Sequence, residues 1–180
     1  METLMEFRRQ YQAGGCYFFT VVTRDRRPIL TCPENISRLR SVFLHVKSKR
    51  PFAIEAIVVL PDHLHTVWRL PDGDADFSTR WRMIKHDFSV VSQGGVKSLS
   101  QQRKGEKGIW QRRFWEHVIR NETDWRRHID YIHYNPVKHH YVNSPSAWPY
   151  SSFLLAVGKG WYPSDWGRQE PDSIKSLHLE

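Results

Sequence analysis

His63 and His65 flank one apolar residue, Leu64, directly after the turn-forming pair Pro61-Asp62. In an extended strand, alternate side chains point to the same face, so both imidazoles would lie on one side with their Cα atoms about 6.6 Å apart. Two imidazoles at that spacing can bind one metal ion, and from this motif alone Zn²⁺ is the expected ion. Two packed or surface histidines would give the same pattern, so the motif needs a partner elsewhere in the chain.

A second set of reactive side chains lies late in the sequence, where Tyr131 and Asn135 are four residues apart. The spacing of apolar residues predicts a helix over residues 122–138, on which residues four apart share a face. Arg127 lies four residues before Tyr131, where it could hold a phosphate. A different stripe, expected to pack on a sheet, contains Trp125, Ile129 and Ile132. Tyr131 therefore need not be buried as part of the core.

Tyrosine is a weak nucleophile at neutral pH because the pKa of its hydroxyl is about 10. It becomes effective when the electrophile is polarised, and a divalent ion on a phosphate also stabilises the leaving oxygen. Two histidines and one amide oxygen leave coordination positions open for phosphate and water, which suits attack on a DNA phosphodiester. The products would be a 5′-phosphotyrosyl link and a free 3′-OH. Tyr134 is the competing nucleophile, but it lies about 60° around the helix from Tyr131.

These motifs resemble a known family. Segment 60–65, Leu-Pro-Asp-His-Leu-His, looks like the HUH motif (U is a hydrophobic residue) of single-tyrosine transposases of the IS200/IS605 type. Segment 130–138 resembles their tyrosine helix, and segments 110–117 and 148–153 fit the branch called REP-associated tyrosine transposases. The similarity runs from about residue 6 to about residue 166 and follows the order of the family's motifs.

The resemblance implies that His63 and His65 are metal ligands, that Tyr131 is the nucleophile, and that Asn135 takes the place of a third ligand, which is Gln in many relatives. It implies Mg²⁺ or Mn²⁺, and the imidazoles favour Mn²⁺ because Mg²⁺ prefers oxygen ligands. It also implies the HUH endonuclease fold. The implied substrate is single-stranded DNA folded into hairpins from repetitive extragenic palindromes, which is cleaved and rejoined in DNA transposition.

The composition is compatible with a nucleic-acid partner. The chain has 27 Lys and Arg against 19 Asp and Glu, a formal net charge of +8, and such an excess predicts an acidic partner. Its 8 Trp, 7 Tyr and 9 Phe offer rings on which bases can stack, although most should be core. The candidate phosphate contacts are Arg24, Arg26, Arg27, Arg80, Arg82, Lys85, Arg112, Arg113, Arg126, Arg127 and Lys138.

The elements that must position these residues follow from hydrophobic periodicity. Strands are expected over residues 16–23, 52–60, 63–70 and about 114–120, and helices from residue 33, over about 74–92 and over 122–138. The second and third strands should form an antiparallel hairpin. Residues 94–108, rich in Gly, Ser, Gln, Lys and Arg, predict a mobile basic loop, and residues 143–180 an irregular tail.

This βαββαβα order predicts a ferredoxin-like α+β sandwich, an antiparallel sheet with helices packed on it, in one domain. With two cysteines, no apolar leader and no long apolar segment, we expect a cytoplasmic protein that is associated with the nucleoid through DNA and not with a membrane. The tail resembles a cover that completes the site in cis, which favours a monomer, and a homodimer is the alternative.

Two other functions fit the same residues. A non-cleaving module could bind hairpin nucleic acid on the sheet, and a zinc-stabilised domain could use the two histidines, although no cysteine joins them. The set His63, His65 and Tyr131 favours the endonuclease. The remaining histidines, which include His117, His128 and His133, have no predicted partner and are expected to be structural or at the surface. The same holds for His139 and His140, which are also expected near DNA.

Overall fold

The computed structural model describes residues 10–91 and 108–177. Within them a four-stranded antiparallel sheet has the strand order β2-β3-β1-β4. The strands are β1 (Cys16–Val22), β2 (Ala53–Val59), β3 (His63–Arg69) and β4 (Trp115–Val118). Helices follow β1, β3 and β4, so the predicted α+β fold with the order βαββαβα is confirmed.

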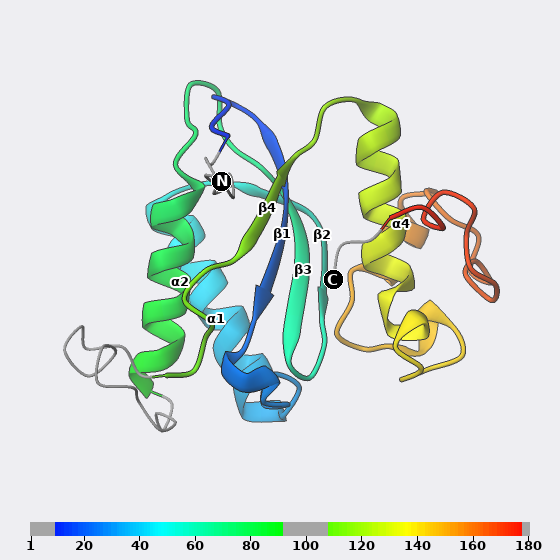
Figure 1. Cartoon of the computed structure of the whole chain (residues 1–180), viewed down its shortest axis with the longest axis horizontal. Coiled ribbons are helices and arrows are strands. Elements are labelled where there is room, and N and C mark those ends of the chain that lie inside the picture. The colour runs from blue at the N-terminus through cyan, green and yellow to red at the C-terminus, as the bar shows by residue number, and fades with distance from the viewer. Residues whose placement is uncertain (1–9, 92–107, 178–180) are drawn as a thin grey trace, which may run out of the picture.

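One face of the sheet is covered by α1 (Pro33–Lys49) and α2 (Phe77–Val91), as Figure 1 shows. Pro33 opens α1 because a proline in the first turn lacks only an amide that would be unpaired there anyway. The apolar residues spaced three or four apart on these helices are buried, among them Leu39 of α1 and Ile84 of α2. Trp81 of α2 stacks on Trp68 of β3 with ring centroids 4.3 Å apart. This aromatic layer fixes the sheet from behind the histidine motif.

Arg80 belongs to that interior and not to the surface. Its side chain is 1% exposed, and its guanidinium forms an ion pair of 2.6 Å with Asp74. It also donates to the backbone oxygens of Arg50, Pro51 and Asp76. The phosphate contact predicted for Arg80 is therefore wrong, because a fully paired guanidinium inside the protein cannot reach DNA.

The opposite face of the sheet is covered by α4 (Glu122–Lys138), which lies across from α1 and α2 in Figure 1. Asn121 caps this helix, since its Oδ1 accepts a hydrogen bond of 2.9 Å from the backbone amide of Asp124. Acidic residues in the first turn and Lys138 in the last turn match the helix dipole. Ile129 and Ile132 pack on the sheet as predicted.

The C-terminal region is more regular than expected. It contains a 3₁₀ turn, η2 (Pro145–Ala147), and a short helix, α5 (Phe153–Gly158), so an irregular tail over the whole of residues 143–180 is wrong. Phe153 and Tyr162 are buried against α4, and Tyr162 contacts Trp166 at a centroid distance of 4.4 Å. The region therefore forms part of the hydrophobic core that lies on the α4 side of the sheet.

The same region covers the outer edge of β2. The backbone amide of Val59 donates to the oxygen of Tyr150, and the amide of Ser152 donates to the oxygen of Ile57, at 2.8 and 2.9 Å. The indole nitrogen of Trp148 donates to the oxygen of Val59 at 3.0 Å. These bonds satisfy backbone groups that an edge strand would otherwise expose.

Two expectations concern other parts of the chain. The basic loop predicted over residues 94–108 lies, except for Gly108, outside the described residues. Among the helices that the structure describes, none has the length and apolar character needed to cross a membrane.

Candidate functional site

The two histidines of the motif lie at the start of β3, on the face that α4 covers. His63 and His65 are 1% and 0% exposed. Their ring centroids are 4.9 Å apart and their planes cross at 80°. A metal ion lies close to the plane of an imidazole that binds it, so two crossed rings at this distance can share one ion, and the structure brings the predicted pair together.

Each ring is held by an oxygen on its Nδ1 side. Nδ1 of His63 lies 2.6 Å from Oδ1 of Asp62, and Nδ1 of His65 lies 2.8 Å from the hydroxyl oxygen of Thr20. Metal-binding histidines commonly use one nitrogen in this way, which fixes the ring orientation and leaves the other nitrogen for the ion. The Nε2 atoms are therefore the candidate ligands.

Asp62 is held in turn by Arg26, whose guanidinium lies 3.1 Å from the second carboxylate oxygen. Burial raises the pKa of Asp62, but the hydrogen bond and charge of His63 and the guanidinium outweigh it and hold that pKa below its ordinary value. Arg26 reaches this position from a tight turn in which Asp25 and Arg26 have φ angles of 55° and 47°. A strained turn after β1 thus supports the first histidine.

Helix α4 brings the predicted nucleophile to the same place. Tyr131 is 1% exposed and its ring centroid is 5.3 Å from that of His65. Although its place outside the apolar stripe did not require it, Tyr131 is buried, because every α4 residue from His128 to Pro136 is buried, a face much broader than one apolar stripe. The sheet covers one side of the helix and the C-terminal region covers another, where Asp130 accepts hydrogen bonds from Tyr162 and Ser173, so polar residues are buried as well as the isoleucines.

The position of Asn135 follows from the contacts that Tyr131 and His139, its neighbours on the helix, make with the two histidines of the motif. Asn135 is fully buried, one helical turn after Tyr131 and one turn before His139. Tyr131 contacts His65, and the ring of His139 is 5.3 Å from that of His63. The intervening Asn135 therefore faces the histidine pair. The sequence predicts His139 near DNA but does not assign it to this site, and its spacing of four from Asn135 was the available signal.

Lys138 contacts the tyrosine directly. Its Nζ donates a hydrogen bond of 3.0 Å to the hydroxyl of Tyr131 and lies 4.7 Å from the ring centroid. Tyr134 instead faces the C-terminal region and contacts Trp166 at 6.5 Å, and burial raises its pKa. The geometry favours Tyr131 as the reactive tyrosine, and it gives Lys138 a partner other than the predicted phosphate.

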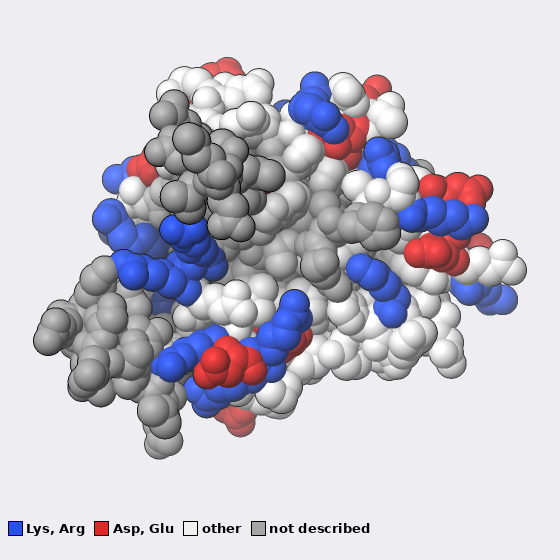
Figure 2. Space-filling view, in the orientation of Figure 1, with Lys and Arg blue, Asp and Glu red and all other residues white. Residues whose placement is uncertain are grey.

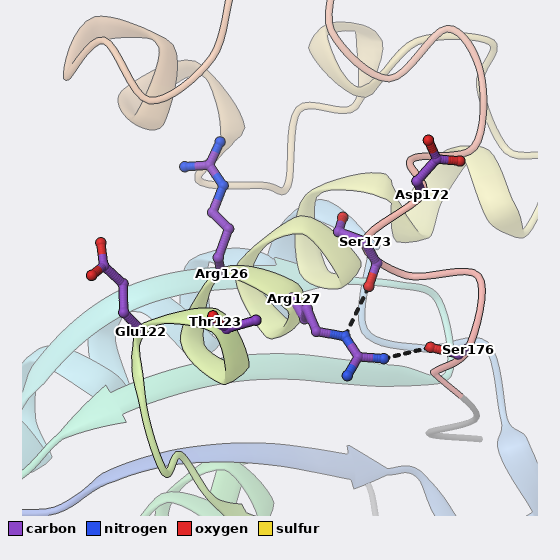
Figure 3. Close-up of a pocket in the computed structure, with 7 residues that line it drawn as sticks. All are labelled: Glu122, Thr123, Arg126, Arg127, Asp172, Ser173 and Ser176. Carbon is purple, nitrogen blue, oxygen red and sulfur yellow. Dashed lines mark hydrogen bonds between the residues drawn. The ribbon is translucent and has the colours of Figure 1, made fainter.

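The predicted basic contacts differ in exposure, and some of the exposed ones also form bonds within the protein. Figure 2 shows Lys and Arg spread over the visible face, with Asp and Glu among them. Arg127 is engaged, because its guanidinium donates to the backbone oxygen of Ser173 at 3.0 Å and to the hydroxyl of Ser176 at 2.6 Å (Figure 3). A phosphate contact of Arg127 beside Tyr131 is therefore not what the structure shows. The predicted contacts with at least partly exposed side chains are Arg24, Arg26, Arg27, Arg82, Lys85, Arg112, Arg113, Arg126, Arg127 and Lys138.

A shallow pocket lies between α4 and the C-terminal region, and Figure 3 shows the residues that line it. They are Glu122, Thr123, Arg126, Arg127, Asp172, Ser173 and Ser176. Neither His63, His65 nor Tyr131 lines it, so this pocket is separate from the histidine site.

A second histidine cluster occurs in the same interface. Nε2 of His117 on β4 lies 2.9 Å from Oδ2 of Asp124, and Nδ1 of His128 lies 2.7 Å from the backbone oxygen of Asp124. Arg120 also donates to Asp124, through both its backbone amide and its Nε, at 3.0 Å. The sequence did not predict this cluster, although His128 lies four residues after Asp124.

The donor set at His63 and His65 fits a divalent ion. The two rings are oriented through Nδ1, the hydroxyl of Tyr131 and the amide of Asn135 come from the facing helix, and all four side chains are almost completely buried. Two imidazoles with one amide oxygen suit Mn²⁺ better than Mg²⁺, because Mg²⁺ prefers oxygen ligands more strongly.

Comparisons with known proteins agree with this geometry. A family described as Transposase IS200 like matches residues 13–135. A REP-associated tyrosine transposase of Escherichia coli K12 is 47% identical over 169 residues, which are 94% of each chain. A relative from Haemophilus influenzae is 41% identical and covers 96% of this chain and 98% of its own.

Among solved structures, a REP-associated tyrosine transposase bound to a REP hairpin is 44% identical and superimposes with a TM-score of 0.77. It covers 97% of this chain and 99% of its own. The fold, the order of the motifs and the similarity over almost the full length agree, and the chain belongs to the IS200-like transposases, in the branch of REP-associated tyrosine transposases.

Proposed function

We propose that this protein cleaves and rejoins one strand of DNA beside a hairpin, with Tyr131 as the nucleophile. The observation that carries the proposal is the contact of the Tyr131 ring with His65, at 5.3 Å, inside a site whose two histidines are held in crossed orientations. His63, His65 and Asn135 would hold the divalent ion, Mn²⁺ or Mg²⁺. When bound, such an ion polarises the phosphate and stabilises the leaving oxygen.

In the cleavage step the hydroxyl oxygen of Tyr131 forms a bond to phosphorus and the bond between phosphorus and the 3′ oxygen breaks. The tyrosine proton is released and the 3′ oxygen takes up a proton, so one phosphodiester is exchanged for another. Rejoining reverses the step, when a 3′-OH attacks the 5′-phosphotyrosine. No external energy source is needed, because the phosphotyrosyl link keeps the phosphodiester for the second transfer.

Lys138 has a part in both directions. An ammonium group 3.0 Å from the hydroxyl of Tyr131 is a charge-assisted donor to this oxygen. Negative charge develops on the oxygen when it is the leaving group in rejoining, and a cation at that distance favours it in a site with little water. Lys138 would thus act on the nucleophile, which goes beyond the phosphate contact expected from the sequence.

The substrate is inferred from the relatives. The solved relative with a TM-score of 0.77 is bound to a REP hairpin. The net charge of +8 of this chain suits an acidic ligand. We infer that this protein also binds hairpins formed by single-stranded palindromic DNA and cleaves beside them.

The test is the formation of a covalent protein–DNA adduct. Protein, Mn²⁺ and labelled single-stranded hairpin DNA are mixed, denatured and separated by electrophoresis. The wild-type protein should give an adduct that survives denaturation, and Tyr131→Phe should give none while binding the hairpin. Tyr134→Phe is the matched control and should still react. An adduct from Tyr131→Phe would refute the assignment, and hairpin binding without cleavage by any variant would favour a non-cleaving binding module.

A further inference from the structure

Trp115 lies on the sheet face that carries the histidine pair. The strand register pairs Thr20 of β1 with His65 on one side and with Trp115 of β4 on the other. Directly paired residues of antiparallel strands share a face, and the hydrogen bond of 2.8 Å between Thr20 and His65 agrees with this. With strands about 4.8 Å apart, Trp115 lies about 10 Å from His65 across the sheet.

The indole of Trp115 is braced without being enclosed. Its ring contacts that of Phe18 at 5.7 Å, and Phe18 is fully buried and contacts His65 at 5.5 Å. His117 lies beside it with a centroid distance of 6.0 Å and an interplanar angle of 5°. Trp115 is nevertheless partly exposed, at the end of the strand order. A partly exposed aromatic ring, braced by Phe18 and His117, thus lies one strand away from the bond between Thr20 and His65.

The charges around this ring suit a nucleic-acid strand. Arg112 and Arg113 precede Trp115 closely and both are exposed. Glu116 follows it, but neighbouring residues of a strand point to opposite faces, so its carboxylate is directed away from the indole. Single-stranded DNA is held by cations along its backbone and by aromatic rings on which its bases stack, and this strand end offers both.

We propose that Trp115 is a stacking subsite for one unpaired nucleobase in the strand that passes the histidine pair, with Arg113 at an adjacent phosphate. This inference rests on the proposed function, because it takes the scissile phosphate to lie at His63 and His65. The strand then runs along the end of the sheet where β1 ends and β3 and β4 begin, from the histidine pair to the edge at β4. A paired base in the hairpin stem would not fit, since its faces are already stacked on its neighbours.

The test separates stacking from cleavage by using Tyr131→Phe protein, which binds but does not react. Hairpins with single-stranded extensions carry 2-aminopurine, whose fluorescence falls on stacking, at one position at a time. We expect one position in the extension to be quenched, and Trp115→Ala or Trp115→Leu in the same background to abolish this quenching. Trp115→Phe should retain most of it.

Affinity gives a second readout. Loss of one stacked base should weaken binding of the extended hairpin by about 5- to 150-fold and leave a hairpin without extensions unaffected. Trp115→Leu keeps an apolar side chain and guards against a folding defect. Trp161→Ala, on the far side of α4, is the matched control and should change neither readout.

Quenching that does not depend on residue 115, or an affinity for the extended hairpin within twofold of the parent, would overturn the subsite. Failure of the proposed function would look different. A wild-type protein that forms no covalent adduct, yet shows quenching dependent on Trp115, would reject cleavage and keep the stacking subsite.

Discussion

Two clusters in the interface between α4 and the sheet each include a pair of neighbouring histidine rings, and the pairs differ in how the rings are arranged. The rings of His63 and His65 cross at 80° with centroids 4.9 Å apart. The rings of His117 and His128 are stacked, with an interplanar angle of 16° and centroids 4.6 Å apart. Both pairs have an aspartate beside them, Asp62 and Asp124, so residue type alone does not distinguish them.

The two clusters differ in how well their rings suit a shared ion. His117, Asp124 and His128 each have one ligand atom within 4.8 Å of the others, but an ion close to the plane of one stacked ring lies out of the plane of the other. Asp124, in the first turn of α4, also accepts hydrogen bonds from both His117 and Arg120. These bonds tie the start of the helix to the end of β4. We therefore interpret the second cluster as a structural network.

The largest expected effect is on DNA cleavage, which should depend on the first cluster and not on the second. His65→Ala should reduce adduct formation with hairpin DNA and Mn²⁺ by at least about a hundredfold, since even partners of metal ligands change affinity or activity by 10- to 100-fold. His128→Ala should stay within a few-fold of the wild type. Hairpin binding is measured for both proteins to show that they still recognise DNA. Equal losses in the two variants would contradict the comparison.

A smaller effect is expected at Asp62, which would contact a metal ligand, His63, and not the ion itself. Asp62→Asn removes the carboxylate that orients His63, and we expect the Mn²⁺ concentration for half-maximal cleavage to rise by about 10- to 100-fold. Asp172→Asn serves as the control, because Asp172 is an exposed residue paired with Lys175. An unchanged Mn²⁺ dependence in Asp62→Asn would mean that the ring of His63 needs no such support.

The smallest expected effect belongs to the second cluster and concerns stability. Burial lowers the pKa of His128 to about 4, whereas an unfolded histidine has a pKa of about 6.5. As the pH falls below about 6.5 the unfolded chain binds a proton that the folded chain does not, so stability decreases until about pH 4.

Between pH 7 and pH 5 this group should lower the free energy of unfolding by about 2 kcal/mol. Denaturant unfolding at both pH values measures it. His128→Phe should lose less stability than the wild type over the same interval. Since burial lowers the pKa of His133 as well, to about 3, part of the decrease should persist in the variant. An equal decrease in both proteins would exclude His128 as its source.

The sequence predicted correctly those helices and strands in which apolar residues recur at a regular spacing. The span of α4 agrees with the predicted 122–138, and β3 begins at His63 as expected. Periodicity could not show that Arg80 is buried, because its position depends on carbonyls of Arg50 and Pro51 that the fold brings close to α2. The same reason explains Arg127, whose partners Ser173 and Ser176 lie far along the chain.

For the site, spacing predicted that His63 and His65 share a face and that Asn135 follows Tyr131 by one turn. It could not give the burial of Tyr131, because a helix packed between a sheet and a C-terminal cover buries more than one stripe. Nor could it give the partners Thr20 and Lys138, which require the strand register and the end of α4. The role of each residue in cleavage stays a prediction.

The backbone bonds between the C-terminal region and β2 have a consequence for solubility. They occupy the outer edge of β2, at Ile57 and Val59. A chain truncated before Tyr150 would leave the apolar end of β2, Ile57-Val58-Val59, with open amides and carbonyls. Such an edge is a template for strand addition between copies, so the truncated chain should aggregate even with its histidine pair and Tyr131 intact.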